Sequence, residues 1–256
     1  MTAGSADGAP HFPKPRFSRF DGIAQRIVEN QEDVATLRIT ENLADQARLE
    51  MLIEDSKPPP PAPGSAGLHF LLSTPFRYPP LRHGSRFGGR FEPGLFYGSQ
   101  ERRTCLRECA YYRLLFWHDM AAPPPNPLRA RHTLFSAAVS SQRCVDLRAR
   151  PYDTLQHELR DPVSYRYTQR LGSQLRAVET EVLLFASARG PGTNVALYMP
   201  SAFAARAPRQ QSAWLSEVNG VGATFSGGGT AVTFAATDFA GSDGALLRVR
   251  PTPEEV

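Results

Sequence analysis

The chain contains little cysteine. Cys105, Cys109 and Cys144 are its three cysteines, too few and too odd in number for a disulfide framework. Cys105 and Cys109 lie four positions apart, but no histidine or further cysteine follows at zinc-ligand spacing, so packing in the core is expected rather than a metal site. A thiol content this sparse is typical of proteins from a reducing cytoplasm, which is the expected location.

Long apolar runs are also absent. No run reaches the roughly 18 apolar residues that a membrane span needs. The opening segment MTAGSADGAPHFPKP has no apolar stretch of the secretory type, so neither a membrane anchor nor a secretory signal is expected. There is no Walker motif, and no GxGxxG opens a helix after a strand, which argues against a Rossmann-type nucleotide site.

Lysine is almost missing. Lys14 and Lys57 are the only lysines, so arginine carries nearly all the positive charge behind the net charge of +4. Biased codon use produces the same skew, and this is our first interpretation of most of the arginines. Acidic residues are interspersed, and neither a continuous basic run nor a basic recognition helix is found. Direct binding to nucleic acid is therefore not expected.

Composition divides the chain into five segments. Residues 1–18 are rich in Gly, Ala, Pro and Ser and are expected to be disordered. Residues 19–56 show helical spacing and predict a helical arm, which either packs on the following domain or docks another protein or a second copy. A proline-rich linker at 57–67 precedes the main domain at 68–240, and 241–256 are expected to form a tail.

The main domain mixes strands and helices without regular βαβ alternation, which predicts an α+β fold. Helices are expected from Ser99, as N-cap, to about Trp117, and over 164–178. Strands are expected over 69–73, 94–99, 132–139, 144–147, 181–188, 193–199, 214–218, 222–226 and 231–236.

One carboxylate of the first expected helix has an unusual setting. At about 100° per residue, Glu108 falls on the apolar side of the helix. Its neighbours one turn away carry no positive charge: Thr104, Cys105, Tyr111 and Tyr112. A buried, unpaired carboxylate costs several kcal/mol, so Glu108 should have a partner or a task. A salt bridge to Arg77, Arg86 or Arg90 is one interpretation, and a reactive carboxylate in a cleft is the other.

The segment before this helix combines arginines with aromatic rings. Guanidinium groups bind phosphate in a bidentate manner, and Gly88 and Gly89 let a ligand approach the backbone closely. Rings that could stack on a flat base are Tyr78, Phe87, Phe91, Phe96 and Tyr97. The combination predicts a ligand with phosphates and an aromatic ring, such as a dinucleotide.

Several strings resemble one known family in the right order. FRYPPLRHGSRFGGRFEPGLFYGS and ECAYYR resemble the first half of a RES domain, a family named for an Arg, a Glu and a Ser. SYRYTQRLGSQLRA and VLLFASARGPGTNVALYMP are similar to the second half, so the resemblance runs roughly from Leu68 to Phe239. It implies a fold like that of ADP-ribosyltransferases, with mainly antiparallel sheets and flanking helices. The helical arm is similar to that of longer members.

The resemblance implies an enzyme and a partner. RES proteins are typically toxins of bacterial toxin–antitoxin pairs, and characterised members degrade NAD+ by phosphorolysis or hydrolysis. NAD+ would be the substrate, inorganic phosphate a potential co-substrate, and no cofactor or metal would be required. The partner would be an Xre-like helix-turn-helix antitoxin, in a hetero-oligomer, or another copy in a homo-oligomer. The alternatives are mono-ADP-ribosylation of a target, or a non-enzymatic nucleotide-binding or interaction module.

The resemblance also implies residue roles. Glu108 matches the catalytic glutamate of the family. Arg77 and Tyr78 match an Arg-Tyr pair that lines the cleft, and Tyr97 matches a tyrosine beside the nicotinamide. The other matches would bind substrate: Arg86, Arg90, Thr168, Gln169, Ser187 and Arg189. Glu92 departs from the family pattern, where many members have asparagine, and an acid there is expected to weaken anion binding.

Overall fold

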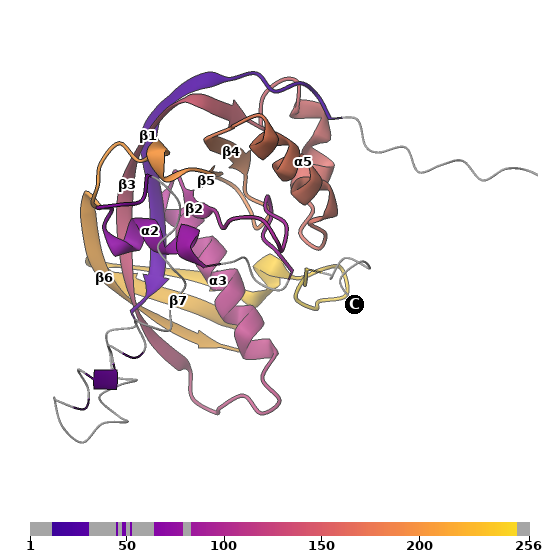
Figure 1. The fold of residues 1–256 in the computed structure, drawn as a ribbon. Coiled ribbons are helices and arrows are strands. Elements are labelled where there is room, and N and C mark those ends of the chain that lie inside the picture. The colour runs from indigo at the N-terminus through magenta and orange to yellow at the C-terminus, as the bar shows by residue number, and fades with distance from the viewer. Residues whose placement is uncertain are drawn as a thin grey trace, which may run out of the picture.

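The computed structural model describes residues 12–30, 45, 48–49, 52, 64–78 and 83–249. Within these ranges one sheet of eight strands is flanked by helices, so the predicted α+β class is confirmed (Figure 1). Neighbouring strands run antiparallel except β3 and β4, which are parallel. In this part of the chain no helix has both the length and the apolar content to cross a membrane.

The strands are β1 (Ser18–Glu29), β2 (Phe96–Ser99), β3 (Leu128–Asp146), β4 (Val182–Ala186), β5 (Thr193–Leu197), β6 (Gln210–Asn219), β7 (Gly222–Gly227) and β8 (Thr230–Ala235). The α-helices are α2 (Phe70–Arg77), α3 (Arg102–His118), α4 (Gln156–Leu159) and α5 (Arg166–Ala177). Short 3-10 turns occupy Asp153–Leu155 (η1), Pro200–Ala202 (η2) and Ala236–Phe239 (η3).

Strands β1, β2, β5, β4 and β3 close into a ring, because β1 pairs with β3 as well as with β2. The pairing of β1 with β3 runs from Ser18 opposite Cys144 to Glu29 opposite His132. The 19-residue β3 is long enough to use its other edge twice, first for β6 and then for β4. Strands β6, β7 and β8 extend the sheet beyond the ring.

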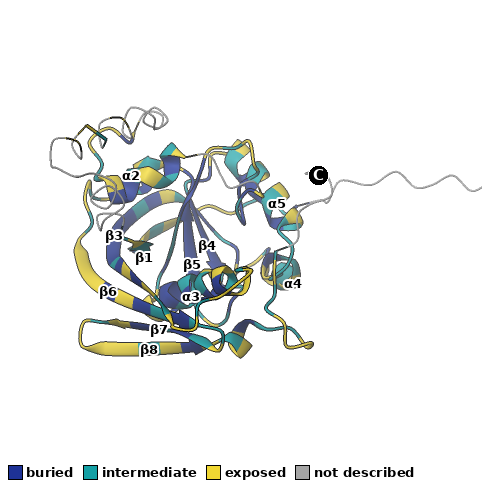
Figure 2. Cartoon of the chain, turned by 90° about the horizontal axis from the view of Figure 1, so that it is seen from below, coloured by how far each residue is buried: buried dark blue, intermediate teal, exposed yellow. Residues whose placement is uncertain are grey.

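Each longer helix covers its own part of the sheet. Leu72 of α2 belongs to the cluster inside the ring, and Leu171 of α5 packs with residues of β4 and β5. Helix α3 packs Leu106 and Leu114 against β6, β7 and β8. Figure 2 shows α3 inside the curve of these three strands, whose outer sides are largely exposed. The buried face of α3 therefore fixes which side of the helix is left for function.

The cysteines are buried or half-buried and free. Burial raises the pKa of Cys109 and of Cys144 to about 12, and it raises the pKa of Cys105 as well. Thiols with such pKa values stay protonated and unreactive at neutral pH. The expected packing role is confirmed. Among the described residues, no group of His, Cys, Asp and Glu side chains could hold a metal ion.

The N-terminal expectations are wrong for residues 12–30. Residues 19–29, predicted as the start of a helical arm, belong to strand β1, because β3 supplies a partner along its whole length. Ahead of it, in the segment expected to be disordered, Phe12 is buried against Tyr167 at a ring distance of 5.1 Å. Residues 45, 48–49 and 52 are helical. Residues 1–11, the rest of the predicted arm, and 57–63 of the linker lie outside the described residues.

Two further expectations need correction. Residues 69–73 were expected as a strand but belong mainly to α2, whose start is capped by His69: its Nδ1 accepts the N–H of Leu71 at 3.2 Å. The strands expected at 132–139 and 144–147 are confirmed, as parts of the single longer strand β3. Ser99 is not the N-cap of α3, since it ends β2 and Glu101 takes the cap position.

The predicted tail is also partly wrong. Tyr111 of α3 donates its hydroxyl to the carbonyl of Leu247 at 2.8 Å, and Leu246 packs on the α3 cluster. Arg248 forms an ion pair with Asp119, just beyond the end of α3. The described part of 241–256 is therefore part of the packed domain.

A buried histidine makes the fold sensitive to acid. His132 of β3 is 1% exposed, and its Nε2 lies 2.8 Å from Oγ of Ser216 on β6. Burial lowers the pKa of His132 to about 4, so the folded chain holds it neutral. The unfolded chain binds this proton below its ordinary pKa of about 6.5. Stability from this group is thus complete above about pH 6.5 and is lost as the pH falls toward 4.

We therefore expect the melting temperature to fall between pH 6.5 and 4.5, with His132 contributing up to about 3 kcal/mol of the loss. His132→Gln keeps a polar partner for Ser216 but cannot titrate. The measurement is the melting temperature of both proteins across this range. A fall of equal size in the variant would show that other groups carry the acid sensitivity.

Candidate active site

Glu108 lies in the middle of α3 and is held by two uncharged groups. Its Oε1 accepts a hydrogen bond from Oγ of Ser187 at 2.7 Å and another from Nδ2 of Asn194 at 2.6 Å. Both donors are buried, Ser187 completely and Asn194 to 94%, since 6% of it is exposed. A hydroxyl and an amide fix the orientation of the carboxyl group without bringing a positive charge to it.

Ser187 reaches Glu108 because a tight turn links β4 to β5. The N–H of Ser187 donates to the carbonyl of Gly192 at 3.0 Å, and the N–H of Arg189 donates to Oγ of Ser187 at the same distance. Gly192 has φ +111°, and a Cβ there would collide with Thr104 of α3. A glycine is thus needed to bring the turn against the helix that carries Glu108.

Asn194 is oriented in turn by Ser99. The two residues lie directly opposite each other on the antiparallel strands β5 and β2. Ser99 donates its hydroxyl to Oδ1 of Asn194 at 2.7 Å, which leaves the NH₂ end of the amide facing Glu108. Neither residue was predicted as part of the site. An asparagine inside the otherwise apolar strand TNVAL was the available signal, because a buried amide needs partners.

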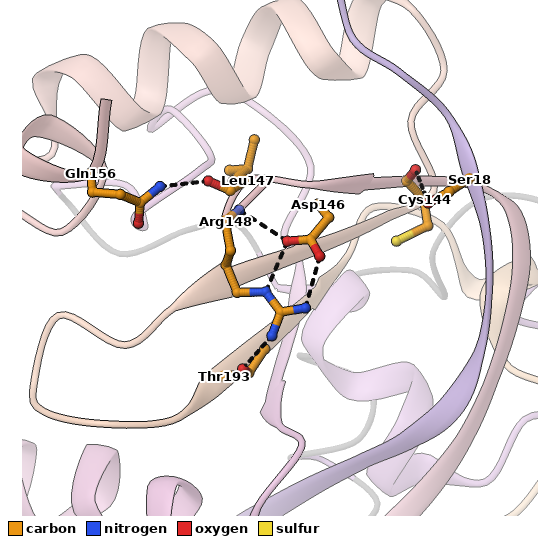
Figure 3. Close-up of polar contacts among 7 residues, drawn as sticks. All are labelled: Ser18, Cys144, Asp146, Leu147, Arg148, Gln156 and Thr193. Carbon is orange, nitrogen blue, oxygen red and sulfur yellow. Dashed lines mark hydrogen bonds and ion pairs between the residues drawn. The ribbon is translucent and has the colours of Figure 1, made fainter. Parts of the chain in front are cut away.

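A polar network fixes the start of β5, one residue before Asn194. Arg148 donates to both carboxylate oxygens of Asp146 at 2.8 Å and to Oγ1 of Thr193 at 2.6 Å (Figure 3). Although burial opposes it, these bonds lower the pKa of Asp146. Glu101, at the start of α3, accepts the N–H of Thr193 at 2.9 Å. The strand and the helix that meet at Glu108 are thus tied together by charged groups.

The polar ends of Tyr97 and Gln169 bind the glycine-rich loop, residues 83–90 with Gly88 and Gly89, instead of lining an open surface. The hydroxyl of Tyr97 accepts the N–H of Phe87 at 3.0 Å and lies 2.9 Å from Oγ of Ser85. Burial raises the pKa of Tyr97 to about 12, so the phenol stays protonated at neutral pH. Gln169 of α5 donates to the carbonyl groups of His83 and Ser85 at 2.8 and 3.1 Å.

Two arginines of the expected site are buried among carbonyl groups and rings. Arg86 donates to the carbonyl groups of Leu159 and Asp161, and its guanidinium lies 4.6 Å from the ring centre of Tyr165. Its bonds go to these groups, so the proposed salt bridge from Arg86 to Glu108 does not form. Arg189 lies 3.5 Å above the ring of Tyr111, one helical turn beyond Glu108.

The remaining expected residues have varied settings. Arg77 ends α2 and is half-buried, and Tyr78 follows it and is exposed. Arg90 is exposed, with its guanidinium 5.2 Å from the ring centre of Phe91. Thr168 is buried in α5 and donates to the carbonyl of Tyr165 at 3.1 Å. The structure thus brings Glu108 and Ser187 into contact and places Arg90 at the surface.

Glu92 has a local partner that the sequence did not predict. Its Oε2 accepts the N–H of Gly89 at 2.7 Å, so the acid caps the turn of the glycine-rich loop. A carboxylate engaged with backbone is less available to repel a bound anion.

Comparison with known proteins was made for the whole chain. A family model described as the RES domain matches residues 62–217, more than half of the chain. No curated protein matches the sequence. Among solved structures the chain is similar to one described as "Crystal structure of the M. tuberculosis MbcT-MbcA toxin-antitoxin complex". That match has 10% identity and a TM-score of 0.45, and it covers 80% of this chain and 87% of the other.

Proposed function

The chain belongs to the RES domain family, and from this premise we propose that it is an enzyme that cleaves the bond between nicotinamide and ribose in NAD+. Glu108 is the catalytic carboxylate in this proposal. The observation that carries it is the pair of neutral donors on Oε1 of Glu108, from Ser187 and Asn194, which orient its carboxyl group at the junction of α3, β4 and β5.

The chemistry suits a single carboxylate. The nitrogen of nicotinamide is already cationic in NAD+, so it takes the bonding electron pair and leaves as a neutral base without a general acid. Positive charge develops at the anomeric carbon, and a nearby carboxylate stabilises that charge more in the transition state than in the ground state. Water or phosphate then forms the new bond to this carbon, and water loses a proton in doing so.

Cationic side chains would bind the diphosphate and hold the ribose near Glu108. Arg77 and Arg90 are the proposed clamp, and contacts remote from the reacting bond lower the barrier by fixing its orientation. Tyr78 is exposed beside Arg77 and is proposed to cap the nicotinamide side. Tyr97 is proposed to act through the loop that it anchors at Ser85 and Phe87.

We also propose that the chain is the toxin of a bacterial toxin–antitoxin pair, with an Xre-like helix-turn-helix protein as its partner. The support is that the chain belongs to the RES family, because the resemblance to this family implies both a toxin and an antitoxin partner. An enzyme that depletes the NAD+ of the cell that makes it would have to be inhibited there, and a protein that covers Glu108 would serve.

The direct test is to incubate the purified chain with NAD+, with and without inorganic phosphate, and to identify the products by mass spectrometry. Free nicotinamide is expected in the arm with phosphate, and in the arm without phosphate as well if water is the nucleophile. ADP-ribose shows hydrolysis, a phosphorylated ADP-ribose shows phosphorolysis, and an ADP-ribosyl group attached to a protein shows ADP-ribosyl transfer. NAD+ that survives intact in both arms, and in a lysate, would contradict the proposal.

Asn194 offers a finer prediction about the same site. A hydrogen bond to a charged group contributes about 1.5–3 kcal/mol. If Asn194→Ala releases Glu108, kcat should fall about 10- to 100-fold with little change in KM. Ser99→Ala, which frees only the far end of the amide, should have a smaller effect in the same direction. Loss of folded enzyme would also lower the apparent kcat without changing KM, so the melting temperature of each variant is measured too and should match that of the wild type.

A further inference from the structure

The structure has two neighbouring cavities whose walls include neither Glu108 nor its hydrogen-bond partners Ser187 and Asn194. The larger, of about 510 Å³, and the smaller, of about 250 Å³, share Arg160 and Ala188 in their walls. Ala188 follows Ser187, so both cavities lie against the turn that holds Glu108. Neither cavity has Glu108 in its wall.

Three arginines line the smaller cavity. They are Arg107 on α3, Arg160 after α4, and Arg189 in the turn after β4. The one carboxylate in its wall is that of Asp238, which lies 3.7 Å from Arg107, a distance at the outer limit of an ion pair. Three positive charges thus face one negative charge.

The partners of these arginines leave most of the positive charge uncompensated. Arg107 donates to the carbonyl of Arg189 at 3.2 Å, and Arg160 donates through Nε to the carbonyl of Ser187 at 3.2 Å. Arg189 donates through Nη1 to the carbonyl of Pro162, while its Nη2 is buried and has no partner among the described residues. Carbonyl groups fix the orientation of a guanidinium without cancelling its charge.

The wall also allows a close approach to the backbone. Gly190 lines the smaller cavity with φ +151°, and a Cβ there would press on the side chain of Arg107. The side chain of Arg107 is only 15% exposed, so an anion bound against it would be partly desolvated, and its attraction to the guanidinium groups would be stronger than in bulk water.

We propose that the smaller cavity is a binding site for a phosphate group, held by Arg107, Arg160 and Arg189. Planar guanidinium forks match the oxygens of a phosphate, and a second phosphate or an attached group has room in the larger cavity. The phosphate can come from free inorganic phosphate or from a nucleotide. Its occupation would tie α3, the α4 segment and the turn of Ser187 together.

The test is calorimetric titration of the purified chain with sodium phosphate, against sodium chloride at equal ionic strength. We expect the wild-type chain to bind phosphate and Arg160→Gln to weaken binding about tenfold, the loss typical of one charge-assisted contact. Arg107→Gln should weaken it similarly. Arg170→Gln is the matched control, since Arg170 is exposed on α5 and lines neither cavity.

Glu108→Gln separates this site from the proposed reaction, because phosphate should bind this variant as it binds the wild type even if NAD+ cleavage proves absent. Adding NAD+ to that variant identifies the source: competition with phosphate indicates the diphosphate of a nucleotide, and independent binding indicates free phosphate. The NAD+ arm alone rests on the proposed function. The proposal is overturned if phosphate binds no better than chloride, or if Arg160→Gln and Arg107→Gln both bind it like the wild type.

Discussion

Glu108→Gln should slow the release of nicotinamide from NAD+ by about 10³-fold, because the variant removes the only charge that the proposed mechanism places at the anomeric carbon. The substitution changes little else. Glutamine has the shape of glutamate, and its amide oxygen can still accept hydrogen bonds from Ser187 and Asn194. The measurement is nicotinamide release by chromatography, at saturating NAD+, for both proteins.

A second glutamate provides the control for this experiment. Glu217 of β6 has a side chain that is 38% exposed and pairs with Arg129 on the surface. Glu217→Gln makes the same chemical change far from the candidate site and should leave the rate unaltered, since exposed ion pairs contribute little. Equal rates for Glu108→Gln and the wild type would remove Glu108 from the mechanism.

The candidate site shows where sequence reasoning succeeds. Glu108 was singled out because its neighbours one helical turn away are uncharged, which needs only the period of a helix. Ser187 and Asn194 come from the turn and the strand after β4, more than 75 residues along the chain, with separations of 79 and 86 residues from Glu108. Such partners depend on how β4 and β5 pass α3, and no local pattern encodes that.

The same difference between local pattern and long-range contacts separates the parts of the fold that the sequence predicts from those that it does not. Helices α3 and α5 and strands β4 to β8 have periodicity and turn residues that are sufficient to locate them. The helical prediction for 19–56 depends on the spacing of Val34, Leu37, Leu43, Ala47 and Leu52, and it took in β1 as the start of the same arm. In the structure β2 and β3 pair with the two edges of β1, and this pairing overrides the local preference for a helix.

Ala24→Asp should prevent the chain from folding, because Ala24 is completely buried at the closure of the ring of strands. A Cβ on Gly98 of β2 would lie only 3.2 Å from Cβ of Ala24, so the space between these strands admits no larger group. An unpaired carboxylate there costs several kcal/mol, which is comparable with the roughly 5–15 kcal/mol that holds a typical domain folded. The measurement is the soluble yield and the thermal transition.

Arg19→Ala on the same strand is the control, since its side chain is 67% exposed and its partner Asp21 lies two residues away on the surface. It should melt within about 1 °C of the wild type, as exposed ion pairs contribute little.

A chain that begins at residue 62, where the family match begins, lacks β1 and should fail like Ala24→Asp. If it folded cooperatively, β1 would be an accessory strand. If it failed, the folding unit would be longer than the region by which the family is recognised, because β3 would lose the partner that spans it from Cys144 to His132.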